Sequence, residues 1–174
     1  MRKLAKFAAG SAAAASAVAC VAAATGFPRR VGLTKSEAAL SLPGDLLLPV
    51  APVQADRAHT FRSSRSGGAG ESALWSHLLE LGDLYALVWN QPLEVVYDRS
   101  GEVLVWRTVP GNGAFAATLA VLLISQADGE LAVRLRERYQ PHDKAGLRAS
   151  RTMTVATALV TSGSWLQLRG ALDA

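Results

Sequence analysis

The three histidines are the residues of this chain best suited by type to metal or acid–base chemistry. His59, His77 and His142 are far apart in the sequence; none belongs to an H-x-x-x-H pair, and none has a carboxylate at ligand spacing. His77 falls between Trp75 and Leu78, a position more typical of a core boundary than of a catalytic base. We therefore expect no metal site and no cofactor.

Nucleophiles and paired carboxylates give no catalytic pattern either. The run Ser162-Gly163-Ser164 lacks the G-x-S-x-G spacing that a strained strand-to-helix turn needs. Asp128, Glu130 and Glu137 are expected to serve a turn and the solvent-facing side of a strand rather than an acid and base pair. The sequence therefore predicts no catalytic residue and a non-catalytic protein.

Composition and charge limit the class of protein. The chain has 174 residues, of which 50% are hydrophobic and 18% are charged, and this composition favours a packed interior over disorder. Arg2, Lys3 and Lys6 supply three of the four excess positive charges, so the remainder is close to neutral. No later block of Lys and Arg is interleaved with aromatic residues, and we therefore expect no nucleic-acid partner.

Residues 1–27 are predicted to be a signal peptide or a membrane anchor. Met1–Phe7 carries the three basic residues, and Ala8–Phe27 is a run of twenty uncharged, Ala-rich residues. The segment has three possible fates: cleavage after Ala22-Ala23-Ala24, acylation of Cys20, or retention as a helix that spans the membrane only marginally because alanine is weakly apolar. The sequence before Cys20 resembles a lipobox without its usual leucine. We expect the protein at the cell membrane or exported.

Residues 28–53 are expected to form an extended linker or arm with one short helix. Thr34 and Glu37 have the spacing of a capping box, in which each side chain bonds the backbone N–H of the other residue. Pro43-Gly44-Asp45 ends this helix. The prolines of Leu46–Val53 lack N–H donors, so this stretch is expected to run over the surface rather than inside a sheet.

Residues 54–174 are predicted to form an α+β domain. Gln54–Arg62 is predicted as its first strand and Glu71–Leu81 as an amphipathic helix that Gly82 terminates, with strand periodicity from Leu84 onward. Turn sequences then separate the strands of an antiparallel meander, and an apolar stretch predicts a long closing helix. The meander strands are Leu93–Tyr97, Val103–Val109, Phe115–Ser125 and Glu130–Tyr139, and the closing helix is Arg151–Leu172.

The last predicted strand alternates between apolar and basic residues. One face presents Leu131, Val133 and Leu135, and the other presents Arg134, Arg136 and Arg138. Three arginines on one strand face could bind an anion. The favoured interpretation is a solvated face on which Glu130 and Glu137 pair with the arginines.

Several segments resemble actinobacterial proteins of the SRPBCC family, which are START-like and polyketide-cyclase-like. Val31–Asp45 resembles their "WGAT-x-x-E…LPGD" sequence, and an N-terminal membrane segment precedes it in many of them. Gln54–Phe61 looks like their first strand, Glu71–Asp83 like their tryptophan-containing helix, and Phe115–Arg138 like their last hairpin. The chain lacks the glycine- and tyrosine-rich stretch usual between that helix and the meander.

The resemblance implies a helix-grip fold, in which a curved antiparallel sheet packs on a long C-terminal helix and leaves a cavity, here preceded by an N-terminal apolar helix. It implies a membrane-associated or exported module that binds a hydrophobic small molecule or lipid. Two alternatives remain: a polyketide cyclase/dehydrase-type enzyme, and an accessory subunit that docks to a membrane complex. Residues that either contact the ligand or simply fill the core are Trp89, Tyr97, Trp106, Phe115, Leu119 and Trp165.

Overall fold

The structure, a computed structural model, describes residues 29–45, 47–48, 51–62, 68–126 and 130–173. The predicted N-terminal segment, including Cys20, lies outside these residues. No helix in the described part of the chain combines the length and apolarity that a membrane crossing requires.

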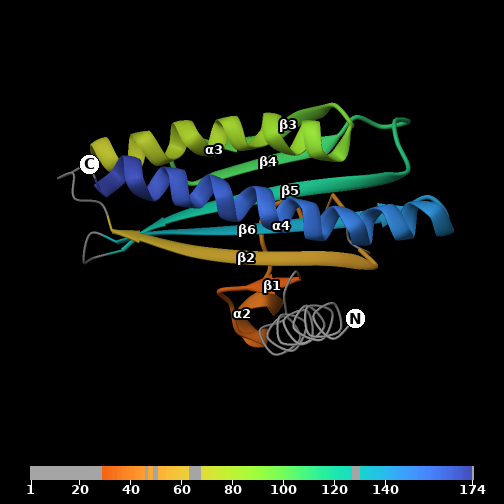
Figure 1. The fold of residues 1–174 in the computed structure, drawn as a ribbon, viewed down its shortest axis with the longest axis horizontal. Coiled ribbons are helices and arrows are strands. Elements are labelled where there is room, and N and C mark those ends of the chain that lie inside the picture. The colour runs from red at the N-terminus through yellow and green to blue at the C-terminus, as the bar shows by residue number, and fades with distance from the viewer. Residues whose placement is uncertain (1–28, 46, 49–50, 63–67, 127–129, 174) are drawn as a thin grey trace, which may run out of the picture.

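One six-stranded sheet forms the framework (Figure 1). Its spatial order is β1-β2-β6-β5-β4-β3, in which β1 pairs parallel with β2 and every other pair is antiparallel. The four strands β3 to β6 follow one another through the sheet, so the predicted meander is confirmed. The strands are β1 (Arg30–Val31), β2 (Val53–Arg62), β3 (Leu93–Arg99), β4 (Val103–Thr108), β5 (Phe115–Ser125) and β6 (Glu130–Pro141).

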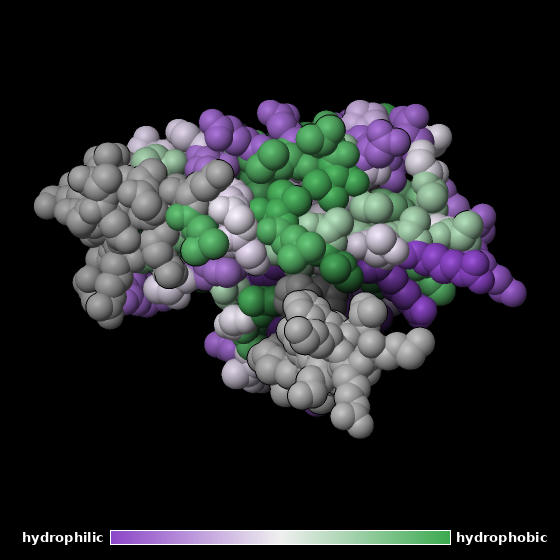
Figure 2. All heavy atoms as spheres, viewed as in Figure 1, coloured by the Kyte–Doolittle hydropathy of each residue, from purple (hydrophilic) through white to green (hydrophobic). Residues whose placement is uncertain are grey.

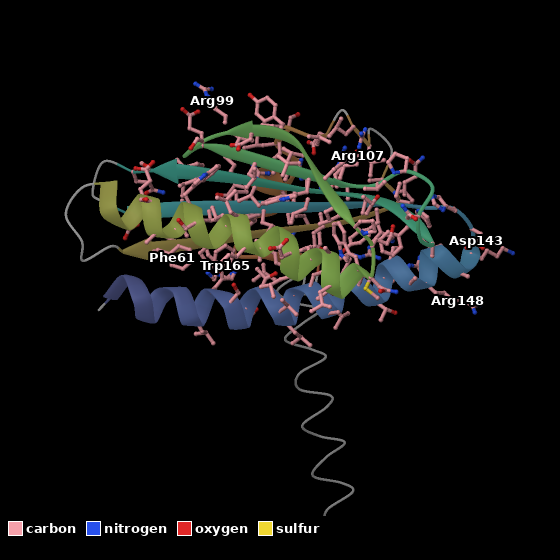
Figure 3. All side chains as sticks on the ribbon, turned by 90° about the horizontal axis from the view of Figure 1, so that it is seen from above. Phe61, Arg99, Arg107, Asp143, Arg148 and Trp165 are labelled. Atoms are coloured by element: carbon pink, nitrogen blue, oxygen red, sulfur yellow. The ribbon has the colours of Figure 1, made fainter. Side chains whose placement is uncertain are left out.

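Two long helices, α3 (Gly68–Trp89) and α4 (Lys144–Asp173), cover one face of this sheet (Figures 1 and 3). They run antiparallel to each other, and the apolar faces of both pack on the inner side chains of the strands. The predicted α+β arrangement, a sheet packed on a long C-terminal helix, is therefore confirmed in these elements.

The helix α3 continues past Gly82 to Trp89, so both the predicted stop and the strand periodicity expected from Leu84 are wrong. Leu81, Tyr85 and Trp89 recur at four-residue intervals and are all buried, and this burial favours a helix through this stretch. Gly82 has a packing role instead: a Cβ there would lie 2.5 Å from Nε1 of Trp106. The helix ends at Trp89, and Asn90, which follows it, has a φ of 49°, the left-handed conformation that commonly terminates a helix.

The short helix α2 (Lys35–Ala39) has the predicted capping box. The Thr34 N–H donates to Oε2 of Glu37 at 2.7 Å, and the Glu37 N–H donates to Oγ1 of Thr34 at 3.2 Å. Asp45, which follows the turn at Gly44, accepts a hydrogen bond from the Leu42 N–H at 2.9 Å. These bonds give the arm a fixed shape before it reaches β2.

The arginines of β6 hold this arm on the sheet face opposite the long helices. Arg136 is buried; it pairs with Asp45 at 2.5 Å and Asp56 at 2.6 Å, and it donates to the carbonyl of Leu40 at 2.9 Å. Arg138 donates to the Asp45 carbonyl at 2.8 Å. The prediction of a solvated arginine face is therefore wrong, because the carbonyl groups and carboxylates of the arm and β2 cover it.

Candidate ligand site between the sheet and the helices

An ion pair lies in the middle of the layer between the sheet and its helices. Arg57 of β2 and Glu137 of β6 occupy neighbouring positions in antiparallel strands, and both side chains face α3 and α4. They are 1% and 0% exposed, and Nη1 of Arg57 donates to Oε1 of Glu137. The Nη2 group donates to the Thr154 carbonyl at 3.0 Å and to Oγ1 of Thr157 at 3.2 Å. A charged group of β2 is thus bonded directly to α4.

Glu137 accepts hydrogen bonds from both helices as well as from the sheet. Oε1 receives the Tyr85 hydroxyl of α3 at 2.5 Å in addition to Arg57. Oε2 receives the Tyr139 hydroxyl at 2.8 Å and the Thr157 hydroxyl of α4 at 2.9 Å. Because four protein donors surround one carboxylate, its oxygens are satisfied by protein groups.

Burial and the charge of Glu137 raise the pKa of Tyr85 and of Tyr139 well above the ordinary value of 10.0. Burial opposes the charge of Arg57, but the neighbouring Glu137 carboxylate outweighs it, and the pKa of Arg57 is raised. Both tyrosines therefore remain protonated at neutral pH and act as hydrogen-bond donors. Neither of them can serve there as a base.

Aromatic side chains flank this polar network on both sides. Toward the end of α3, the Trp89 ring contacts Tyr85 and Tyr139 at centroid distances of 5.2 and 5.4 Å, and its Nε1 donates to the Tyr139 hydroxyl at 3.1 Å. Phe115 packs edge-on against Tyr139 at 5.3 Å. This side of the interior is closed by rings whose polar atoms are satisfied.

On the other side, Trp165 of α4 is the centre of an aromatic group that includes Phe61, His59 and His77. Its ring lies 5.3 Å from Phe61, 5.0 Å from His59 and 6.3 Å from His77, and Figure 3 shows Phe61 and Trp165 between the sheet and α4. Trp165 is 4% exposed, yet its Nε1 has no hydrogen-bond partner among the described residues. This indole N–H is a buried donor without an acceptor in the part of the chain that the structure describes.

His77 is held beside this group by α4. Its Nε2 lies 2.5 Å from Oγ of Ser164, and burial lowers its pKa although the charge of Glu80 opposes the shift. The imidazole is therefore neutral at pH 7. The buried Arg57–Glu137 pair is internally compensated. Neither His77 nor this pair therefore contributes a net positive charge to the layer between the sheet and the helices.

The structure brings five of the six predicted site residues into the interior. Trp89, Trp106, Phe115, Leu119 and Trp165 all belong to one buried cluster. Tyr97 does not: it lies 49% exposed on the edge strand β3, beyond a register shift that separates it from Val95. The prediction that Tyr97 faces the interior is therefore wrong, since the strand register shifts between Val95 and Tyr97.

The polar network is the part of the site that the sequence analysis missed. Glu137 was assigned to the solvent-facing side of β6, whereas its odd position places it with Leu131, Val133 and Leu135 on the inner face. Arg57 likewise occupies an odd position of β2, on the same face as the buried residues Val53, Ala55 and Phe61. Strand alternation alone could have placed both charged residues inside.

No family model matches the chain, and no curated protein matches it. Among solved structures it is similar to DR_A0006 from Deinococcus radiodurans, with 18% identity and a TM-score of 0.38 over 57% of this chain and 92% of that one. It is also similar to Ara h 8.0201, with 9% identity and a TM-score of 0.40 over 68% and 96% of the two chains. For the hypothetical protein jhp0584 from Helicobacter pylori, the identity is 11% and the TM-score 0.37 over 69% and 96%.

Proposed function

We propose that this protein is a non-catalytic module that binds an apolar small molecule or lipid carrying a hydrogen-bond acceptor, between the sheet and the helices beside Trp165. The proposal rests on the buried indole N–H of Trp165, which has no acceptor among the described residues and is surrounded by aromatic rings. An unsatisfied buried donor costs about 1–3 kcal/mol, so a bound acceptor at this position recovers that free energy. The helix-grip resemblance of the sequence supports the same function.

The surroundings favour a neutral acceptor such as a carbonyl, ether or hydroxyl oxygen. His77 is uncharged at neutral pH, and the charge of Arg57 is compensated by Glu137. A carboxylate placed beside Trp165 would therefore lose its hydration without gaining a cationic partner from these groups. The rings of Phe61 and Trp165 favour a flat, apolar body for the remainder of the ligand.

The geometry of Glu137 supports the absence of catalysis. Each of its oxygens accepts two hydrogen bonds, and the two tyrosines that donate to it have raised pKa values. One observation favours the alternative of a cyclase-type enzyme: the interior does hold polar groups with strongly shifted pKa values. Their protons are directed to Glu137, however, and binding is therefore the better-supported function.

The experiment uses two probes of similar shape, acetylnaphthalene, which carries a carbonyl, and ethylnaphthalene, which has no acceptor. Each probe is titrated into the full-length protein and its affinity is measured by calorimetry. Acetylnaphthalene should bind about five-fold more tightly than ethylnaphthalene, which corresponds to the net free energy of one neutral hydrogen bond. Trp165→Phe removes the donor and should abolish the preference while ethylnaphthalene still binds. Trp75→Phe, at a half-buried position of α3, is the control that should leave the preference intact. Failure of both probes to bind, or equal affinities in the unsubstituted protein, would refute the proposal.

Membrane association or export of this module remains part of the proposal and depends on residues 1–27. Their basic start and uncharged, Ala-rich continuation support it. These residues lie outside the described part of the structure.

A further inference from the structure

The two long helices expose a group of apolar side chains on the side facing away from the sheet. Leu84 and Leu87 of α3 are 37% and 77% exposed, and Val155 and Leu159 of α4 are 42% and 64% exposed. Figure 2 shows hydrophobic side chains gathered over the middle of the helix pair. Single exposed leucines are ordinary, whereas a group on one face marks an interaction surface. We call these four residues the helix-face patch.

Charged residues accompany the patch at matching positions on the two helices. On α3, the exposed acids Glu80 and Asp83 stand seven and four positions before Leu87. On α4, the exposed bases Arg148 and Arg151 stand seven and four positions before Val155. These spacings correspond to about two turns and one turn of helix, so each charged pair shares a face with the apolar residue that follows it. In Figure 3, Arg148 is directed away from the sheet.

The antiparallel course of the helices separates the two charged pairs. His77, early in α3, lies beside Ser164, late in α4, while Tyr85 lies beside Thr161. Residues that precede the patch on α3 therefore lie at one end of it, and residues that precede it on α4 lie at the opposite end. The two acids of this set consequently lie toward one end of the helix pair and the two bases toward the other.

A two-fold rotation about an axis in the plane of this surface and perpendicular to the helices exchanges its two ends. It places the patch of one copy on the patch of another, and it brings the basic end of each copy over the acidic end of the other. Two-fold interfaces require this kind of self-complementary surface. An anionic bilayer would be repelled by Glu80 and Asp83, which lie beside the apolar group.

We propose that the outer face of α3 and α4 is the interface of a homodimer, in which Arg148 and Arg151 of each copy meet Glu80 and Asp83 of the other around a shared apolar centre. The occupant is a second copy of this chain because the charge distribution of the surface complements itself. This interface is on the outer side of the helices, so it leaves the Trp165 site between the helices and the sheet unchanged.

Sedimentation velocity of the full-length protein at low ionic strength tests the proposal with four samples. The unsubstituted protein should sediment as a dimer. The variant Glu80→Lys/Asp83→Lys opposes base to base at both ends, and Arg148→Glu/Arg151→Glu opposes acid to acid, so each alone should dissociate at least ten-fold more readily. An equimolar mixture of the two variants restores opposite charges at both ends and should again give dimers.

The substitutions are at exposed positions, and thermal unfolding of each variant verifies that its fold is retained. Residues 1–27 are identical in all samples, so association through them cannot respond to the charge exchange. Leu159→Asp removes the apolar centre and should prevent association in every mixture. A monomeric unsubstituted protein, association that is insensitive to charge reversal, or a mixture that fails to recover dimers would each overturn the proposal. A monomeric unsubstituted protein that binds phosphatidylglycerol vesicles, and loses this binding in Leu159→Asp although residues 1–27 are unchanged, would assign this face to a membrane instead and would also overturn the proposal.

Discussion

The guanidinium of Arg57 and the carboxylate of Glu137 form an ion pair that connects the second strand of the sheet, its neighbour β6 and both long helices. A buried ion pair is not by itself evidence of stability, because desolvation offsets the attraction. In this protein the ion pair positions the helices. Tyr85 of α3 and Thr157 of α4 both donate to Glu137, so one carboxylate fixes the positions of both helices relative to the sheet.

Removing the charge of Glu137 should destabilise the fold strongly. Glu137→Gln leaves the buried guanidinium of Arg57 without its counter-charge, and we expect the free energy of unfolding to fall by about 3–5 kcal/mol. Urea denaturation followed by circular dichroism measures this loss. The double variant Arg57→Met/Glu137→Leu removes both charges and should recover much of it. Equal losses in the single and double variants would contradict this account of the ion pair.

The raised pKa values of Tyr85 and Tyr139 predict a loss of stability in alkaline solution. The unfolded chain releases their protons near pH 10.0, whereas the folded protein retains them to higher pH, so stability is intact below that value and falls above it. Each retained proton contributes a slope of about 1.4 kcal/mol per pH unit. Urea midpoints measured from pH 8 to 11 should therefore decline less steeply in Tyr139→Phe. Tyr97→Phe, which removes a hydroxyl at an exposed position outside this network, is the matched control.

Arg136 should hold the arm on the outer face of the sheet. It is 3% exposed and pairs with two carboxylates, whereas Arg107 and Glu94 form a pair in which each side chain is 42% exposed. Arg136→Ala should accelerate cleavage after Glu37 by a glutamate-specific protease and lower stability by about 2–4 kcal/mol. Arg107→Ala should cost about 0–1 kcal/mol and leave cleavage unchanged. Similar effects of both substitutions would exclude a holding role for Arg136.

Two glycines inside the long helices should respond to alanine in opposite directions. A Cβ at Gly82 would lie 2.5 Å from Nε1 of Trp106, whereas a Cβ at Gly163 would meet nothing within 4 Å. Gly82→Ala should lower the melting temperature, since overpacking costs about 1–3 kcal/mol. Gly163→Ala should raise it, because alanine stabilises a helix by about 1 kcal/mol relative to glycine. Stabilisation at both positions would show that Trp106 moves aside freely.

The mass of the mature protein, recovered from a bacterial host with intact export, distinguishes the fates of residues 1–27. A chain beginning at Thr25 indicates cleavage, an acylated chain beginning at Cys20 indicates a lipoprotein, and a chain beginning at Met1 indicates retention. Recovery of the intact chain in the soluble cytoplasmic fraction would contradict both export and membrane association.

Strand alternation and turn residues were sufficient to predict the meander, and the spacing of Thr34 and Glu37 was sufficient to predict the capping box of α2. The extension of α3 could not be predicted in the same way. Leu84–Trp89 is a continuous apolar run, so it fits either a buried strand or a buried helix. Its helical form depends on burial of Tyr85 and Trp89 against the sheet.

Only the apolar part of the candidate site was predicted. Large aromatic residues are expected inside a domain, so Trp89, Phe115 and Trp165 were identified from their type alone. Arg57 and Glu137 belong to residue types that are usually exposed. The side-chain partners of Arg57 lie 28 to 100 positions away in the sequence. Such long-range pairing leaves no local pattern apart from the position of each residue in its strand.

Nuclear magnetic resonance of the Trp165 indole tests the binding proposal most directly. With acetylnaphthalene in excess, the Trp165 indole proton should move downfield as it donates to the carbonyl, while ethylnaphthalene should cause a much smaller change. Trp165→Phe identifies the resonance by its disappearance. An indole resonance that keeps its position at saturating acetylnaphthalene would show that this buried donor does not bind the acceptor, and the proposed function would be wrong.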